Sequence, residues 1–123
     1  MGKKILILED DVFLSKAYVI ILTKEGYQVT NFPNGRQGLE ATKKDKFDLI
    51  LLDLLMPELG GIEFLKEFQP KKNSSTKIIV FSNLSSEEAI KEVMDLGAIK
   101  YIAKATFSPK EMVQLIGETL SEK

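Results

Sequence analysis

The sequence predicts an α/β domain whose parallel sheet is covered by helices on both faces. Short apolar runs alternate five times with helical patterns along the 123 residues, which is typical of consecutive β–α units. The run at residues 49–52 is apolar at every position, as expected for a strand buried on both faces of a parallel sheet. The length and the 44% of hydrophobic residues suit one domain with its own core.

Five apolar runs predict the strands. Three acidic residues follow the first run, and the third run ends at Asp53, shortly before Pro57, so both strands lead into polar turns. Ser82 follows the fourth run and Lys104 follows the fifth. We place the strands at residues 4–8, 27–32, 47–53, 77–81 and 100–103.

The helices are predicted from periodicity and from their caps. Gly26 ends the first helix at the position that glycine prefers, and Pro109 opens the last one where its missing N–H costs least. Capping-box spacing occurs at Asn34 with Gln37, Ser85 with Glu88, and Ser108 with Glu111. We place the helices at residues 12–25, 34–44, 62–68, 85–97 and from residue 108 onward.

The composition narrows the possible functions. The chain has no cysteine and no histidine, which excludes disulfides, thiol catalysis, His-ligated zinc and a histidine phosphate carrier. The net charge of −1 gives no reason to expect nucleic acid or an anionic membrane as a direct partner. The apolar run near the N-terminus is too short for a signal peptide or a membrane span. We therefore expect a cytoplasmic protein, with a single domain over residues 1–123 and no output domain.

Polar side chains gather where the predicted strands end. They are Glu9, Asp10 and Asp11 after the first strand, Asp53 after the third, Ser82 after the fourth and Lys104 after the fifth. These strand ends share one edge of a parallel sheet, where ligands bind. Two carboxylates about 4 Å apart repel by roughly 4 kcal/mol at a surface-like dielectric, and Mg²⁺ relieves such repulsion in an all-oxygen site. Because aspartate can accept a phosphoryl group, and its transfer needs mainly positioning and charge neutralisation, the pattern indicates phosphoryl chemistry. Asp11 alone is expected to cap the first helix.

Taken in order, these motifs resemble the receiver domain of two-component response regulators, over residues 3–120. The matching pieces are the run ending in Glu9-Asp10-Asp11, Asp53 with Met56-Pro57, Gly61, Ser82, and Gly97-Ala98 followed by Tyr101 and Lys104. The resemblance implies a flavodoxin-like, doubly wound sheet of strand order 2-1-3-4-5 with five helices. It also implies a phosphoacceptor switch rather than an enzyme. Its donor would be a phosphohistidine on a histidine kinase or histidine phosphotransfer protein.

The resemblance further implies a set of metal ligands. Asp53 would be the phosphoacceptor. Mg²⁺ would be bound directly by Asp10, Asp53 and the backbone carbonyl of Leu55, and by Glu9 mainly through a metal-bound water.

The remaining site residues would contact the phosphoryl group or respond to it. Ser82 and Lys104 would each contact one of its oxygens, and Tyr101 would be the aromatic switch whose rotamer reports the state of the site. The surface formed by the fourth helix, the fifth strand and the fifth helix would then change. A downstream target protein or a fused output domain would bind that surface.

Some neighbours of the site differ from the family pattern. The lysine is usually followed by proline, whereas Ala105 follows Lys104 here. We expect a trans bond between them, since a cis bond before a non-proline residue costs about 2.5–4 kcal/mol. Asn83 stands where a small residue is common. Leu55 and Leu84 should exclude water from the acyl phosphate, which predicts slow self-dephosphorylation.

Other functions fit parts of the sequence. A degenerate receiver could act as a phosphorylation-independent protein-interaction module. An aspartate-nucleophile phosphohydrolase normally carries a second Asp where Leu55 stands, so its turnover should be poor. A flavin-binding domain of this topology would need a Ser/Thr/Gly-rich loop after the first strand, which is missing here.

The first helix has more apolar residues than one buried face needs. The predicted inward stripe is Leu14, Ala17, Tyr18, Ile21 and Leu22. Three further apolar residues, Phe13, Val19 and Ile20, are left over. They are either partly buried under loops or form a docking patch for a partner's helices.

Overall fold

The computed structural model describes residues 2–84 and 86–121, and five strands of this part form one parallel sheet. The order in space is β2-β1-β3-β4-β5, which confirms the predicted fold class. The strands are β1 Lys4–Leu8, β2 Gln28–Phe32, β3 Leu49–Leu52, β4 Lys77–Ser82 and β5 Lys100–Ala103. The register aligns the ends of neighbouring strands, as where Leu8 pairs with both Phe32 and Leu52.

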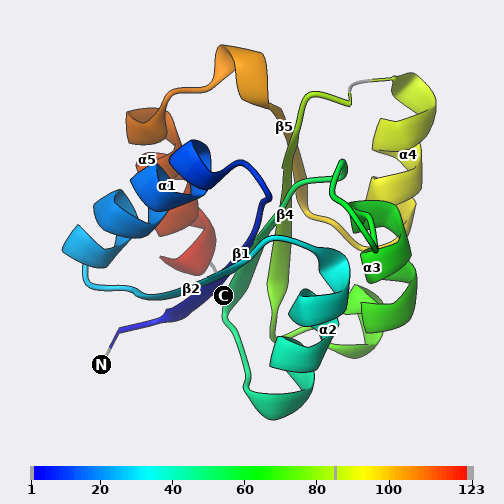
Figure 1. Ribbon diagram of the computed structural model, residues 1–123, viewed down its shortest axis with the longest axis horizontal. Coiled ribbons are helices and arrows are strands. Elements are labelled where there is room, and N and C mark those ends of the chain that lie inside the picture. The colour runs from blue at the N-terminus through cyan, green and yellow to red at the C-terminus, as the bar shows by residue number, and fades with distance from the viewer. Residues whose placement is uncertain (1, 85, 122–123) are drawn as a thin grey trace.

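Five α-helices of the described residues cover both faces of this sheet (Figure 1). On one face lie α1 Val12–Lys24 and α5 Pro109–Ser121; on the other lie α2 Gly35–Lys44, α3 Gly61–Phe68 and α4 Glu87–Asp95. The chain runs from β1 outward to β2 and then back across to β5, so right-handed crossovers put α1 opposite α2, α3 and α4. The described residues also form two short 3₁₀ turns, η1 Pro70–Lys72 and η2 Lys104–Thr106. None of the helices in these residues has the length and hydropathy to cross a membrane.

Two separate cores explain the unbroken apolar runs of the central strands. Successive side chains of a strand point to opposite faces. Leu6 and Leu8 of β1 therefore pack in the core under α2, α3 and α4, whereas Ile5 and Ile7 pack against α1 and α5. The residues of β3 are divided in the same way, and all four are at most 2% exposed. A strand with an apolar core on each face needs no polar alternation.

The predicted capping box at Ser108 is confirmed in full, and at Asn34 the predicted side-chain cap is confirmed. The Asn34 side chain accepts a hydrogen bond from the Gln37 N–H at 2.9 Å. At the start of α5 the bonds are reciprocal: Glu111 Oε1 accepts from the Ser108 N–H at 2.8 Å, and Ser108 Oγ accepts from the Glu111 N–H at 3.2 Å. These contacts satisfy backbone donors that the helix itself leaves without partners.

The first turns of α1 and α4 differ in detail from the prediction. Ser86 caps α4, accepting a backbone hydrogen bond at 3.1 Å, and the predicted cap Ser85 lies outside the described residues. On α1 the predicted inward residue Ala17 is exposed, and Ser15 is buried. Ser15 Oγ donates to the carbonyl of Val12 at 3.2 Å. Because this bond satisfies the hydroxyl within the helix, a polar residue can face the sheet there.

Candidate functional site

The predicted site residues meet at the edge of the sheet where β1, β3, β4 and β5 end. Glu9 and Asp10 directly follow β1, and Asp53 directly follows β3. Ser82 is the last residue of β4, and Lys104 is the first residue after β5. The parallel order thus brings side chains from four distant parts of the sequence to one edge.

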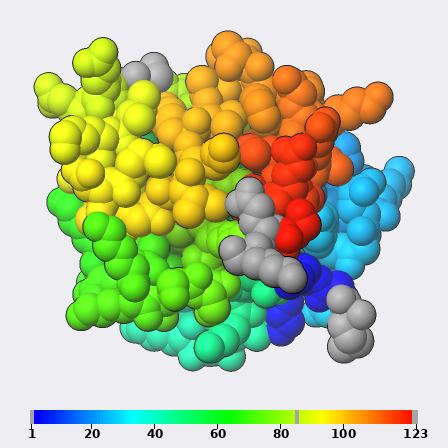
Figure 2. Space-filling model, turned by 180° about the vertical axis from the view of Figure 1, so that it is seen from behind, coloured from blue at the N-terminus to red at the C-terminus, as the bar shows by residue number. Residues whose placement is uncertain are grey.

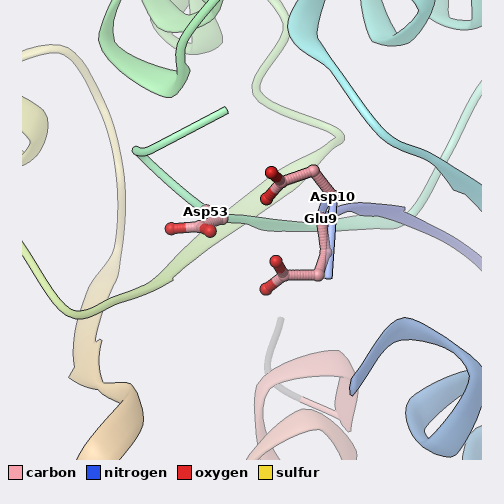
Figure 3. Close-up of side chains that lie close together, drawn as sticks. All are labelled: Glu9, Asp10 and Asp53. Carbon is pink, nitrogen blue, oxygen red and sulfur yellow. The ribbon is translucent and has the colours of Figure 1, made fainter. Parts of the chain in front are cut away.

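Three carboxylates form an acidic cluster at this edge (Figure 3). One oxygen each of Glu9, Asp10 and Asp53 lies within 4.8 Å of the others. Glu9 and Asp53 are only 5% and 4% exposed, whereas Asp10 is exposed. Converging hard oxygen donors suit Mg²⁺ and leave room for its waters on the solvent side. The donor set therefore fits the predicted metal site, with Asp10 at its entrance.

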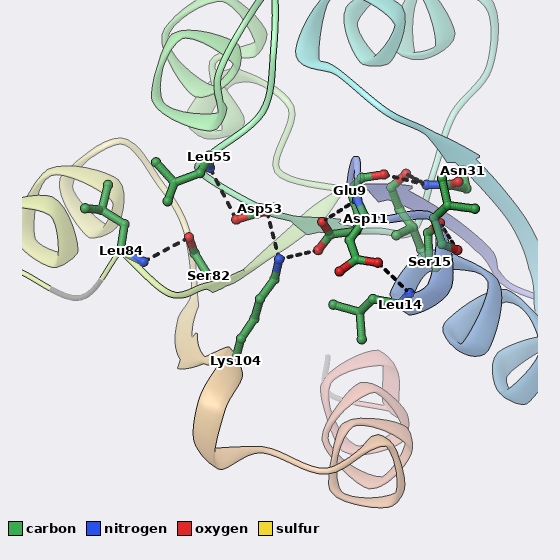
Figure 4. Close-up of polar contacts among 12 residues, drawn as sticks. Glu9, Asp11, Leu14, Ser15, Asn31, Asp53, Leu55, Ser82, Leu84 and Lys104 are labelled. Atoms are coloured by element: carbon green, nitrogen blue, oxygen red, sulfur yellow. Dashed lines mark hydrogen bonds and ion pairs between the residues drawn. The ribbon is translucent and has the colours of Figure 1, made fainter.

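Lys104 bridges the two buried carboxylates (Figure 4). Its Nζ lies 2.5 Å from Glu9 Oε1 and 2.8 Å from Asp53 Oδ2. Its side chain is 15% exposed, so this network is screened little by solvent. One ammonium compensates two carboxylates, and the site keeps an excess of negative charge that a divalent cation can neutralise.

The pKa values of these groups follow from burial and pairing. Burial raises the pKa of Glu9, although hydrogen bonds from Lys104 and the Asp11 backbone oppose the rise. Burial by itself would lower the pKa of Lys104, but the hydrogen bonds to Asp53 and Glu9 outweigh it, and the pKa is raised. Lys104 is therefore a permanent cation at neutral pH.

Backbone N–H groups hold the carboxylates from the other side. The Leu55 N–H donates to Asp53 Oδ1 at 3.2 Å, and the Asp11 N–H donates to Glu9 Oε2 at 3.0 Å. Asp11 also accepts from the Leu14 N–H at 3.1 Å, which confirms it as the N-cap of α1. The turns after β1 and β3 thus fix the direction of Glu9 and Asp53.

Ser82 and Tyr101 are linked through the loop after β4. Ser82 is fully buried, and its Oγ accepts a hydrogen bond from the Leu84 N–H at 3.3 Å. The half-buried Tyr101 donates from its hydroxyl to the carbonyl of Leu84, and its oxygen lies 3.4 Å from the carbonyl of Ser82. Tyr101 and Ser82 are therefore both hydrogen-bonded to Leu84 in the loop after β4.

The residues that depart from the family pattern surround this site. The bond between Lys104 and Ala105 is trans, as predicted, since the described residues contain no cis peptide. Asn83 is exposed, and Leu84 is half-buried. Leu55 is 55% exposed, so its side chain lies at the surface next to Asp53.

Three residues near the site were not predicted as part of it. Asn31 of β2 donates from Nδ2 to the carbonyl of Ile7 at 3.0 Å and lies 3.5 Å from that of Glu9. It supports the turn after β1, but β2 also carries the polar residues Gln28 and Thr30, so no signal in the sequence singled out Asn31. The other two, Tyr18 and Phe81, line a small cavity together with Glu9 and Asp53. Their positions in an apolar helix face and an apolar strand predicted only that they belong to the core.

The sequence and the fold are similar to those of known proteins. The model of the response regulator receiver domain matches residues 5–117. The chemotaxis protein CheY of Thermotoga maritima is 35% identical over 119 residues, covering 96% of this chain and 98% of that protein. Sporulation initiation phosphotransferase F of Bacillus subtilis is 34% identical over 104 residues, covering 85% and 83%. A CheY-like response regulator receiver domain protein of Methanospirillum hungatei has a TM-score of 0.91 at 30% identity, covering 98% of this chain and 94% of that one. The chain therefore belongs to the response regulator receiver domain family.

Proposed function

We propose that Asp53 accepts a phosphoryl group from the phosphohistidine of a partner protein and that this modification switches the domain. The observation that carries the proposal is the bridge of Lys104 between Glu9 and Asp53, at 2.5 and 2.8 Å, beside the carboxylate of Asp10. A cation next to a buried carboxylate can stabilise the negative charge of a phosphoryl group on that carboxylate. The relative from Bacillus subtilis is named for phosphotransfer, which supports this chemistry.

The acidic cluster is the proposed Mg²⁺ site. Asp10, Asp53 and the backbone carbonyl of Leu55 would bind the ion directly, and Glu9 would act through a bound water. The ion, when bound, would neutralise charge on the phosphoryl oxygens.

Beyond the phosphohistidine donor and the proposed Mg²⁺, the transfer needs no further reactant. A carboxylate oxygen of Asp53 forms the new O–P bond while the N–P bond of the phosphohistidine breaks, and the electron pair of that bond stays on the imidazole nitrogen. Lys104 exchanges its contact with Asp53 for one with a phosphoryl oxygen, and the Ser82 hydroxyl donates to another.

The added charge is the proposed switch. A phosphoryl group adds about −1.5 to −2 charges at neutral pH, which draws the Ser82 hydroxyl toward Asp53. The Leu84 N–H now bonded to Ser82 Oγ, and the Tyr101 hydroxyl bonded in the same loop, must then find new positions. The affected surface is formed by α4, the edge strand β5 and α5, which lie side by side in yellow to red in Figure 2. We propose that a downstream target or a fused output domain recognises this surface.

The exposed side of α1 is the proposed docking patch for the phosphohistidine partner. Val12, Phe13 and Ile20 are 57%, 88% and 59% exposed, whereas Val19 packs against the core. The patch begins at Val12, two residues after Asp10, so a helical partner that covers it can place its histidine at the acidic cluster. Exposed apolar groups of this kind mark interaction surfaces.

The domain would act as a switch in the cytoplasm and not as a turnover enzyme. Leu55 and Leu84 contact the site through their backbones, and both apolar side chains keep water away from the acyl phosphate. The phosphorylated state is therefore expected to persist.

Intact-mass spectrometry after incubation with acetyl phosphate tests the proposal. We expect the parent to gain one phosphoryl group only with Mg²⁺, and Asp53→Asn to gain none. Asp45→Asn is a matched control, because Asp45 pairs with Lys4 at 2.7 Å, away from the acidic cluster. If neither acetyl phosphate nor a histidine kinase modifies the parent, the domain is instead a phosphorylation-independent interaction module.

A further inference from the structure

An aromatic pair lies beside the ammonium of Lys104. Phe81 of β4 and Tyr18 of α1 are 4% and 2% exposed. Their ring centroids are 5.5 Å apart at an interplanar angle of 81°. Lys104 Nζ lies 6.0 Å from the centroid of the Phe81 ring. Both rings line a cavity of about 10 Å³ together with Glu9 and Asp53, so they belong to the floor of the site.

Regular secondary structure does little to hold Lys104. β5 ends at Ala103, and Lys104 opens the three-residue turn η2, which has no side-chain cap. Four methylene groups separate its backbone from its ammonium, and each rotatable bond adds freedom. The ammonium is therefore held by its ion pairs with Glu9 and Asp53 and by contacts with the side chains around it.

We infer that Phe81 and Tyr18 are positioning residues for Lys104. The face of an aromatic ring carries negative charge and attracts a cation, most strongly where water is excluded. The edge-to-face contact with Tyr18 fixes the orientation of the Phe81 ring and presents its face to Lys104. The inference rests on the proposed function, since the placement of Lys104 matters for catalysis only if Asp53 accepts a phosphoryl group.

The ring of Tyr18, not its hydroxyl, carries this role. The contact between Tyr18 and Phe81 is the edge-to-face packing of the two rings. Burial raises the pKa of Tyr18 to about 12, although the charge of Lys104 opposes the rise. The Tyr18 side chain is therefore a neutral aromatic ring at physiological pH, and it lies close enough to Lys104 for the charge of the lysine to influence its pKa.

The placement of Lys104 can be measured without phosphorylation. The rate at which N-hydroxysuccinimidyl acetate acylates Lys104 is followed by peptide mass spectrometry in Mg²⁺-free buffer, relative to the exposed Lys43. We expect Phe81→Leu and Tyr18→Leu to raise this relative rate about threefold to tenfold, because a freed ammonium loses its pairing. Tyr18→Phe keeps the ring and should leave the rate unchanged.

Phe64→Leu is the matched control for loss of a buried ring. Phe64 is fully buried on the opposite face of the sheet and stacks on Phe68 at 5.5 Å and 11°. Its loss should lower stability without changing the acylation of Lys104. Equal acylation of Lys104 in the parent and in Phe81→Leu would overturn the inference.

A double-mutant cycle tests whether the rings act through Lys104. Phosphorylation by acetyl phosphate should be about threefold to tenfold slower in Phe81→Leu than in the parent, but no slower in the double variant with Lys104→Ala than in Lys104→Ala alone. Equal slowing in both backgrounds would make Phe81 a core residue and nothing more. If the parent is not phosphorylated, the proposed function fails, and the acylation rates still decide the placement of Lys104.

Discussion

At the scale of single residues, the buried carboxylates of the site carry an electrostatic cost. Glu9 and Asp53 are buried next to each other, and Lys104 forms an ion pair with both. Removing charged groups from water is expensive, and pairing repays this only in part. The pKa of Glu9 is raised because burial disfavours its charged form more than the hydrogen bonds from Lys104 and the Asp11 backbone favour it. This cost arises where a cation and a phosphoryl group are expected to bind.

The stability of the metal-free domain should depend on the protonation of Glu9. Because the pKa of Glu9 is raised above its ordinary value of 4.5, the folded state binds this proton more tightly than the unfolded state. Its contribution to stability is full below pH 4.5 and is lost as the pH rises through the folded pKa. Glu9→Gln, which mimics the protonated form, should be more stable than the parent at pH 7, and the difference should vanish toward pH 4.

Urea denaturation between pH 4 and pH 8 measures this difference. Glu40→Gln is the control for the substitution itself, because Glu40 is an exposed residue of α2. A Glu9→Gln variant that is less stable than the parent at pH 7 would show that the ion pair with Lys104 outweighs the burial of Glu9.

The lifetime of the acyl phosphate should depend on Leu55 and Leu84. Hydrolysis needs a water in line with the bond, and polar side chains at these positions can bind and orient one. The double variant Leu55→Asn with Leu84→Glu should therefore lose its phosphoryl group about tenfold faster or more. Decay of the intact mass after removal of acetyl phosphate measures this, with Ile99→Asn as a control at an exposed apolar residue. Unchanged decay in the double variant would refute the role of the leucines.

At the scale of elements, close approach of helix and strand matters more than helix propensity. A Cβ at Gly38 of α2 would lie 2.5 Å from Leu8 Cδ1, and Leu8 is fully buried. A Cβ at Gly117 of α5 would have its nearest neighbour at 3.8 Å, the hydroxyl of Tyr27. A side chain at Gly38 would therefore clash with the sheet, whereas a methyl group at Gly117 would fit, although both glycines lie inside helices.

Alanine at these two positions should have opposite effects on stability. Gly38→Ala should destabilise the domain by about 1–3 kcal/mol, because α2 must move away from β1. Gly117→Ala should stabilise it by about 0.5–1 kcal/mol, because alanine favours the helix and no neighbour is displaced. Urea denaturation of both variants checks the signs. A stabilised Gly38→Ala would mean that Leu8 can repack.

The exposed face of α1 should matter only for protein donors. Ile20→Glu places a charge in the proposed docking patch and should slow phosphotransfer from a histidine kinase or phosphotransfer protein about tenfold or more. Phosphorylation by acetyl phosphate should not change, because the acidic cluster is untouched. Met94→Glu is the matched control on α4, where Met94 is 40% exposed. An unchanged rate from the protein donor in Ile20→Glu would remove α1 as the docking surface.

At the scale of the whole molecule, binding at the strand ends is coupled to folding. The acidic cluster exists only when β1 and β3 lie side by side, so Mg²⁺ should bind the folded state alone. At ten times its dissociation constant the ion should then stabilise the domain by about 1.4 kcal/mol.

Thermal denaturation with and without Mg²⁺ measures this coupling. Asp10→Asn should lose the stabilisation, whereas Asp45→Asn, which removes the pair with Lys4, should be less stable than the parent but keep the response to Mg²⁺. An equal response to Mg²⁺ in Asp10→Asn would place the ion elsewhere.

Local patterns in the sequence predicted most of the fold. Apolar runs, the side-chain caps at Asn34 and Ser108, and the polar residues at the ends of β1, β3, β4 and β5 depend on neighbours along the chain, and the structure confirms them. The strand order came from the family resemblance, because periodicity alone does not say which strands are neighbours. The prediction placed Ala17 on the buried side of α1, but the structure has Ser15 there and Ala17 exposed. Ser15 was missed because a helix can satisfy a serine hydroxyl internally.

By itself the sequence determined which groups stand at the strand ends, and hence the chemistry open to this domain. Only the tertiary structure decided that Glu9 and Asp53 are buried and share Lys104, that Tyr101 is tied to the loop after β4, and that Phe81 faces the ammonium. The physical reason is that capping and periodicity act between close neighbours in the chain. Burial, charge pairing and ring contacts arise between residues that only the packed sheet and helices bring together.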